Sequence, residues 1–236
     1  MRLITAVCLA LGAFAITGAQ AEPTDDSLEV YVVRMLWGAE QNLGGAGVYL
    51  GNGLVITAAH VAGADTSGVR IDGLNVAAKL VKTGAFPRLD LSLVAMDADK
   101  LPISLRLRRM PLCQQPPRVA AAVIVAAPQG ITRSRIMSPL LFTVDVRWKI
   151  PGALVTVAAP LSPLLPATNL RWKVTPVISE GATDGKSGSG VFDADKKCLL
   201  GILSQKITNT VEHKDVGTYF VPASTIQSFV PTGTHW

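Results

Sequence analysis

One short run of the sequence has the residue types of a reactive loop. Gly185-Lys186-Ser187-Gly188-Ser189 places a serine among small residues. A serine hydroxyl is a weak nucleophile unless a nearby base takes its proton, so this interpretation requires a partner elsewhere in the chain. The competing interpretation is that Gly185-Lys186-Ser187 ends a phosphate-binding P-loop, which would make the chain a nucleotide enzyme.

The spacing disfavours the P-loop. That motif needs four residues between its glycines, whereas Gly181 and Gly185 have three between them. A P-loop also opens a helix whose N-terminus holds phosphate, but Gly-Ser-Gly-Val-Phe-Asp at 188–193 is typical of a strand. The sequence therefore predicts no nucleotide, and no other cofactor or metal is indicated.

The chain offers three histidines as the base. His235 is next to the last residue, and His213 lies in the polar, loop-like run 209–215. His60 instead follows the apolar run Leu54–Ala59, and a polar group at the end of a buried strand needs a partner. The plainer alternative for His60 is a core histidine that bonds to backbone.

Three motifs resemble those of the chymotrypsin-like (trypsin-fold) serine proteases, in bacterial single-domain form. They are Thr57–His60 (TAAH), Leu89–Val94 (LDLSLV) and Gly185–Ser189 (GKSGS), and their order along the chain is that of this family. The resemblance implies that Ser187 is the nucleophile, His60 the general base and Asp90 the carboxylate that orients it. It also implies an oxyanion hole made by the backbone N–H groups of Gly185 and Ser187.

Within these motifs some alternatives stay open. Ser189 is a second candidate nucleophile, although it falls where the family has its second glycine. Asp97 and Asp99 are alternatives to Asp90, although Met96–Lys100 is typical of a turn after a strand. Ser92 stands where the family usually has alanine.

Lys186 is the main departure from the family. Its usual residue there is an aspartate, which pairs with a new N-terminal amine when trypsin-like zymogens are cleaved. A lysine has no acceptor for an ammonium group, so we expect no switch of that kind.

The substrate-binding residues also come from the resemblance. Gly201–Ser204 resembles the family's G-I-V-S strand, which implies that Ser204 hydrogen-bonds near Asp90 or binds substrate backbone. Gly181, six positions before Ser187, would floor the S1 pocket with Ala182 and favour an uncharged side chain, although Glu180 is adjacent. Gln205 and Lys206 replace an aromatic residue and a glycine that are common after this strand.

The elements that must position these residues are predicted to be strands. Short runs rich in Val, Ile, Leu and Thr are bounded by Gly, Pro, Asn and Asp, and Asn52-Gly53 is a strong hairpin signal. The runs are Glu29–Val33, Ala46–Leu50, Leu54–Thr57, Leu91–Ala95, Val119–Val125, Ala153–Val157 and Cys198–Leu203. They favour an all-β sandwich or barrel.

Two β units fit this pattern, and the family resemblance makes each a six-stranded antiparallel β-barrel. The proline-rich run Pro111–Pro117 divides residues 28–110 from 118–222. A C-terminal helix is expected over 223–230, with Ser224 as its cap and Ile226, Phe229 and Val230 packed inward. No PDZ-sized domain follows Val230, so 22–236 is expected to be a single protease domain.

The N-terminus predicts export. Arg2, an uncharged apolar run and Ala19-Gln20-Ala21 fit a signal peptide over 1–21, with an uncleaved membrane anchor as the alternative. Cleavage would remove one of the 22 basic residues and none of the 17 acidic ones, so the net charge would fall from +5 to +4. No basic stripe is interleaved with aromatic residues, so nucleic-acid binding is not expected. No later segment is long and apolar enough to span a membrane, so stable membrane association after cleavage is not expected either.

Export would leave two cysteines, Cys113 and Cys198. A pair in an oxidising compartment favours a disulfide over two buried thiols, and two cysteines alone cannot close a zinc site. The sequence thus predicts a secreted or periplasmic serine endopeptidase acting on a protein or peptide substrate. The alternative is a catalytically inactive trypsin-fold binding protein.

Overall fold

The computed structural model describes most of the chain after residue 24. The described residues are 25–63, 66–86, 88–137, 143–150, 153–160, 177–179, 185–209 and 214–231. The predicted signal peptide, residues 1–21, lies outside them.

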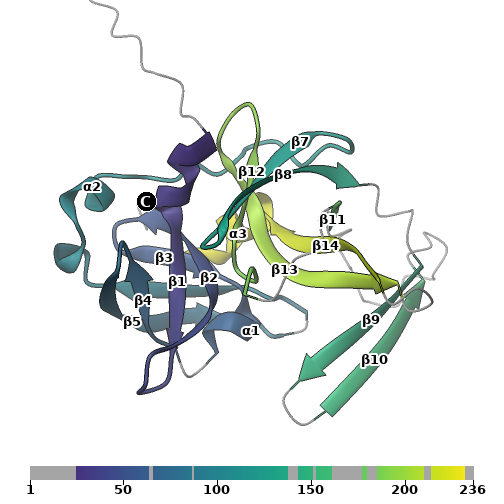
Figure 1. Ribbon diagram of the computed structural model, residues 1–236, viewed down its shortest axis with the longest axis horizontal. Helices are drawn as coiled ribbons and strands as arrows, with labels where there is room; N and C mark the ends of the chain where they lie inside the picture. Colours follow the sequence, from purple (N-terminus) through teal and green to yellow (C-terminus); the bar gives the residue numbers. More distant parts are fainter. Residues whose placement is uncertain are drawn as a thin grey trace, which may run out of the picture.

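Six antiparallel strands close the first barrel in the order β1-β2-β3-β6-β5-β4 (Figure 1). They are β1 (Val32–Trp37), β2 (Asn42–Gly51), β3 (Leu54–Thr57), β4 (Thr66–Ile71), β5 (Leu74–Thr83) and β6 (Ser92–Met96). The predicted hairpin joins β2 to β3, and Asn52 and Gly53 both have positive φ, 50° and 76°. Positive φ at both central residues is what a type I′ turn requires.

Six more antiparallel strands close the second barrel in the order β11-β14-β13-β12-β7-β8. They are β7 (Ala122–Ala127), β8 (Gly130–Met137), β11 (Val177–Ile178), β12 (Gly190–Asp193), β13 (Leu199–Asn209) and β14 (Lys214–Pro222). The expected architecture of two six-stranded antiparallel barrels is therefore confirmed. β9 (Thr143–Ile150) and β10 (Ala153–Pro160) form a separate two-stranded sheet, which projects from the second barrel in Figure 1.

The largest hydrophobic cluster joins the two barrels. Each barrel also has a core of its own, but the shared cluster takes buried side chains from both. Its members include Val48, Leu50 and Ile56 of the first barrel and Ile124, Phe192 and Ile202 of the second. Burial of this apolar surface is the main force that fixes one barrel against the other.

The N-terminal segment corrects one strand prediction. Residues 29–31 belong to the 3₁₀ helix η1 (Asp25–Tyr31), and β1 starts only at Val32. The reason is tertiary: η1 contacts β1 and β2 as well as β7 and β8, and Leu28 is buried in the cluster shared by the barrels. A strand here would continue β1 and would not turn Leu28 into that cluster.

The C-terminal helix α3 (Ala223–Phe229) has the predicted buried face, with Ile226, Phe229 and Val230 at most 5 % exposed. The prediction that Ser224 caps it is wrong. The N-cap is Pro222, which makes no side-chain cap, so Ser224 lies inside the first turn. Pro222 supplies the extended entry by restricting its own φ.

Cys113 and Cys198 form a disulfide with their Cα atoms 5.1 Å apart. The linker that carries Cys113 also bridges to β13, since Leu112 pairs with Leu199 and Cys113 N–H donates to the Leu199 carbonyl at 3.0 Å. The disulfide therefore fastens the linker between the barrels to the second barrel.

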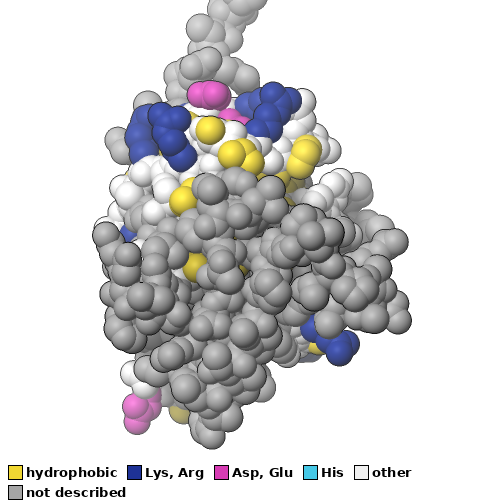
Figure 2. Space-filling view, turned by 90° about the vertical axis from the view of Figure 1, so that its right-hand side faces the viewer, with side chains coloured by type: hydrophobic (Ala, Val, Ile, Leu, Met, Phe, Trp, Pro, Cys, Tyr) yellow, Lys and Arg dark blue, Asp and Glu magenta, His cyan; other side chains and the backbone are white. Residues whose placement is uncertain are grey.

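Three short helices complete the described part: α1 (Ala59–Ala62), η2 (Ala98–Lys100) and α2 (Ile103–Arg106). Among the described residues no helix is long and apolar enough to cross a membrane. On the face seen in Figure 2, the described Lys and Arg side chains lie in separate groups, with acidic side chains between the two upper ones. The described side chains of that face make no continuous basic stripe.

Candidate active site

His60 lies in α1, which follows β3 after a single residue. Ala58 and Ala59 are buried, and their small side chains let the chain turn at the end of the strand. No side chain at Ala58 caps the helix. Instead the His60 backbone N–H donates to Asp90 Oδ1 at 3.0 Å, so the carboxylate satisfies an N–H at the helix start.

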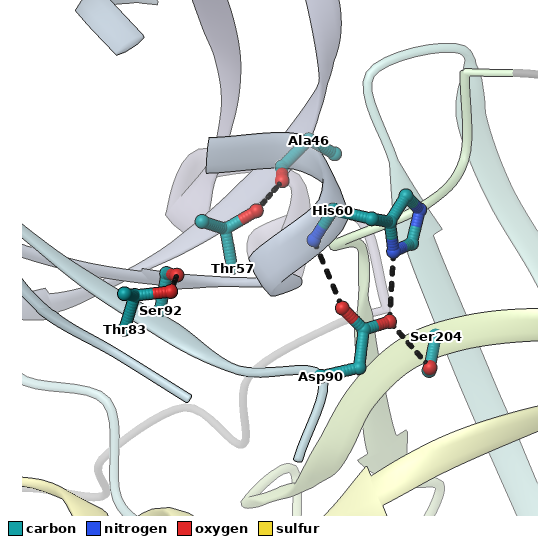
Figure 3. A network of polar contacts seen from close by, with 7 residues as sticks. All are labelled: Ala46, Thr57, His60, Thr83, Asp90, Ser92 and Ser204. Carbon is teal, nitrogen blue, oxygen red and sulfur yellow. Dashed lines mark hydrogen bonds and ion pairs between the residues drawn. The ribbon is translucent and has the colours of Figure 1, made fainter. Parts of the chain in front are cut away.

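The second carboxylate oxygen of Asp90 contacts the imidazole ring of His60 (Figure 3). Asp90 Oδ2 lies 2.8 Å from His60 Nδ1, and the Ser204 hydroxyl donates to the same oxygen at 2.6 Å. Asp90 directly precedes Leu91 and β6, and Ser204 lies on β13, so this network spans both barrels. Burial leaves the Asp90 side chain only 4 % exposed.

The network keeps Asp90 ionised. Burial alone would raise the pKa of its carboxyl, but hydrogen bonds from His60 and Ser204 and the charge of His60 outweigh burial and hold this pKa below its ordinary 3.8. An ionised carboxylate only accepts hydrogen bonds, so Nδ1 carries the imidazole proton. In the neutral imidazole, His60 Nε2 is then the acceptor that a general base needs.

The His60 side chain is accessible to solvent, whereas that of Asp90 is buried. The His60 side chain is 32 % exposed, and Figure 3 shows its second ring nitrogen pointing away from Asp90. Phe86 flanks the imidazole with its ring centroid 6.1 Å away and tilted by 56°.

The serine loop at 185–189 is held by backbone contacts to both barrels. The Ser187 carbonyl accepts from Ala46 N–H of β2 at 2.9 Å, and Gly188 N–H donates to the Leu203 carbonyl of β13 at 2.9 Å. Because Leu203 precedes Ser204, the same stretch of β13 anchors both the loop and Asp90. Gly185 and Gly188 have φ of +86° and +85°, which favour glycine.

Gly188 marks a close approach between the barrels. A Cβ there would collide with the Ala46 carbonyl oxygen and meet Thr57 Oγ1. Thr57 is fully buried and donates its hydroxyl to that carbonyl at 2.5 Å (Figure 3). The role of Thr57 does not follow from the motif itself; the signal in the sequence is a hydroxyl at the end of an apolar strand.

The reactive groups of the loop remain open. Within the described part of the chain, the N–H groups of Gly185 and Ser187 donate no hydrogen bond, and Ser187 Oγ makes none to His60. Two N–H groups beside a serine, neither with an acceptor among the described residues, are of the kind that an oxyanion hole needs. Hydrogen bonds between a nucleophile and its base are often long in a free enzyme and tighten with substrate.

The alternative residues lie elsewhere. Asp97 accepts from the backbone of Asp99, and Asp99 pairs with Arg106 at 3.2 Å, all around the exposed helix η2. Ser189 is fully buried, so substrate cannot reach it. The Ser92 hydroxyl, unusual for the family, is buried and shares a 2.7 Å hydrogen bond with Thr83 (Figure 3).

Several predicted residues lie outside the described part of the chain: His213, His235, Glu180, Gly181 and Ala182. Lys206, two residues after Ser204, pairs with Asp215 at 3.4 Å across β13 and β14. No group of three His, Cys, Asp or Glu side chains among the described residues could hold a metal ion.

Comparison of structures identifies the architecture. The chain is similar to the MamO protease domain of Magnetospirillum magneticum, with a TM-score of 0.58, 19 % identity and coverage of 86 % of this chain and 97 % of that one. It is also similar to the Rv3671c protease of M. tuberculosis. The active form gives a TM-score of 0.56 at 18 % identity, covering 86 % and 80 % of the two chains. The inactive form gives 0.55 at 16 %, covering 86 % and 88 %.

No protein-family model and no curated protein sequence matches the chain. At these identities the likeness to solved structures shows the fold alone. Two closed six-stranded barrels and these structural matches together show that the chain has the chymotrypsin-like fold.

Proposed function

We propose that this protein is an exported serine endopeptidase. The observation that carries the proposal is the Asp90 carboxylate, which holds His60 through both its backbone N–H and Nδ1 while it accepts from Ser204. A buried carboxylate fixed in this way leaves Nε2 free to accept a proton, on a ring that substrate can reach.

In the proposed reaction Ser187 Oγ attacks the carbonyl carbon of a peptide bond while His60 Nε2 takes the hydroxyl proton. Asp90 holds the imidazole and stabilises the imidazolium that forms. The N–H groups of Gly185 and Ser187 donate to the oxyanion. The C–N bond then breaks, His60 passes its proton to the leaving amine, and water hydrolyses the acyl-enzyme by the same steps in reverse roles.

Three finer features belong to the proposal. Export rests on the predicted signal peptide over 1–21 and is supported by the disulfide between Cys113 and Cys198. Because Lys186 replaces the family's aspartate, the enzyme needs no new N-terminus for activity. The family resemblance implies that Gly181 and Ala182, which lie outside the described residues, floor the substrate pocket, so an uncharged substrate side chain is expected there.

The proposal is tested with the mature chain and a fluorophosphonate probe, beside casein hydrolysis. Wild type should label and cleave, and Ser187→Ala should do neither. If wild type fails both assays, or if Ser187→Ala labels equally, the proposal is wrong.

The second candidate is a binding protein that has lost activity. Its supporting observation is that Ser187 Oγ makes no hydrogen bond to His60 in the described part of the chain. A folded wild-type protein that binds a peptide without cleaving it or reacting with the probe would favour this candidate.

A further inference from the structure

The two-residue turn between β7 and β8 lies against the serine loop. Ala127 pairs with Gly130, so Pro128 and Gln129 form the turn. Gln129 Nε2 is only 3.1 Å from the position that a Cβ on Gly185 would occupy. A side chain of the second barrel thus reaches the residue that begins the loop.

The Gln129 carboxamide is exposed, and within the described residues it makes no hydrogen bond. It lies beside Gly185, whose own N–H is also unpaired in the described part of the chain. A neutral amide N–H and a backbone N–H thus lie at one place, and neither has an acceptor among the described residues. Such a pair suits an anionic oxygen that arrives with the substrate.

The first barrel holds this turn in place. Arg34 Nη2 donates to the Pro128 carbonyl at 3.1 Å, and Arg34 lies opposite Ala46 in the ladder of β1 and β2. Ala46 in turn donates its N–H to the Ser187 carbonyl at 2.9 Å. Two residues that face each other on β1 and β2, Arg34 and Ala46, therefore hold the turn with Gln129 and the loop with Ser187, respectively.

We propose that Gln129 is a catalytic residue whose side-chain N–H donates a third hydrogen bond to the oxyanion, with Arg34 as the residue that positions its turn. This inference rests on the proposed function. It adds a side-chain donor to the two backbone donors of Gly185 and Ser187. A donor aimed at charge that develops in the transition state raises kcat and leaves KM nearly unchanged.

The test uses the mature chain with Gln129→Ala and Gln129→Glu. Loss of one oxyanion donor lowers kcat by about 10²-fold in other hydrolases, so Gln129→Ala should lower kcat by about this factor with KM within about threefold. Gln129→Glu should be at least as slow, because a carboxylate accepts hydrogen bonds and repels the oxyanion. The labelling rate should fall in parallel, since the phosphonyl oxygen takes the place of the oxyanion.

The matched control is Gln227→Ala, which removes an exposed carboxamide from α3 and should leave kcat, KM and Tm unchanged. Arg34→Gln should lower kcat by less than Gln129→Ala does, and adding it to Gln129→Ala should lower kcat little further. If wild type reacts and Gln129→Ala matches Gln227→Ala, this inference is wrong while the proposed function stands. A rise in KM alone would also overturn it, since it would assign Gln129 to substrate binding. If wild type neither cleaves nor labels, both proposals fail.

Discussion

The two halves of the candidate site are built in different ways. On the first barrel, His60 and Asp90 are fixed by side-chain hydrogen bonds, and the carboxylate is buried. On the second barrel, the loop with Ser187 is fixed by backbone contacts and glycines, and the N–H groups of Gly185 and Ser187 have no acceptor among the described residues. Under the proposed function, the base is therefore assembled before substrate arrives, whereas backbone contacts of the loop position the two N–H groups that would meet the oxyanion.

The largest effect should come from the side-chain half. In Asp90→Asn the amide donates to His60 Nδ1, so the proton moves to Nε2 and the base is blocked. The activity should fall by about 10⁴-fold, the size typical of this change in chymotrypsin-like enzymes. Steady-state kinetics on a peptide ester measures it, and an unchanged kcat/KM would remove Asp90 from the mechanism.

The backbone half should break at Gly188. Gly188→Ala places a Cβ against the Ala46 carbonyl and Thr57. We expect the free energy of unfolding to fall by about 3 kcal/mol, the upper end of the usual cost of adding a methyl group to a packed core. Gly73→Ala is the control, because Gly73 has φ of +80° but nothing within 4 Å of the added methyl group. Urea denaturation of both variants separates the steric clash with Ala46 from the cost of a positive φ in alanine. Equal losses in the free energy of unfolding would contradict the close approach at Gly188.

Ser204, which reaches Asp90 from the second barrel, should show how the stability supplied by the His60–Asp90 network depends on pH. The depressed pKa of Asp90 adds stability that is present above the unfolded value near 3.8 and is lost as pH falls through the lower folded value. Ser204→Ala removes one donor, so the folded pKa of Asp90 rises and this stability is lost at higher pH.

At neutral pH the cost of Ser204→Ala should be about 1.5–3 kcal/mol, the usual worth of a hydrogen bond to a charged group. Unfolding is followed by circular dichroism between about pH 2 and 7. If the free energy of unfolding of Ser204→Ala falls with decreasing pH over the same range as that of wild type, the Ser204 hydroxyl does not stabilise the carboxylate.

The smallest expected effects concern two buried serines, Ser92 on the first barrel and Ser189 in the serine loop. Ser92 shares a hydrogen bond with Thr83, whereas Ser189 Oγ has no partner within the described residues. Ser92→Ala should cost about 1 kcal/mol, while Ser189→Ala should be neutral or stabilise by up to about 1 kcal/mol. Thermal unfolding of both variants gives the answer, and a loss at Ser189 as large as at Ser92 would reveal a partner for its hydroxyl.

The sequence predicted the parts that local pattern encodes. Leu54–Thr57 is a strand, Asn52-Gly53 is its hairpin, and the alternation of apolar runs and turns is that of an all-β fold, whose two barrels were implied by the family resemblance. The motif with His60 marks a tight turn after that strand. These features are local in sequence, so residue types and spacing are enough to find them.

Features that depend on distant contacts were missed. Glu29–Tyr31 has strand-forming residues, yet burial of Leu28 between the barrels makes this segment a 3₁₀ helix. Gln129 lies in an ordinary hairpin turn, and only the tertiary structure places its carboxamide beside Gly185 of the serine loop. Arg34 acts across the barrel interface, so no spacing in the sequence connects it to Pro128.

The two ends of the described chain have a consequence for how this protein comes into being. The helix η1 near the start packs on β7 and β8 of the second barrel, and the carbonyl of Phe229 near the end accepts a hydrogen bond from Lys82 of the first barrel at 2.8 Å. When the strands of the first barrel have been synthesised, Leu28 is therefore still exposed, because the second-barrel surface that covers it is synthesised later. We expect docking of the barrels to wait for α3, so that His60 and Ser187 meet only in a chain that is complete.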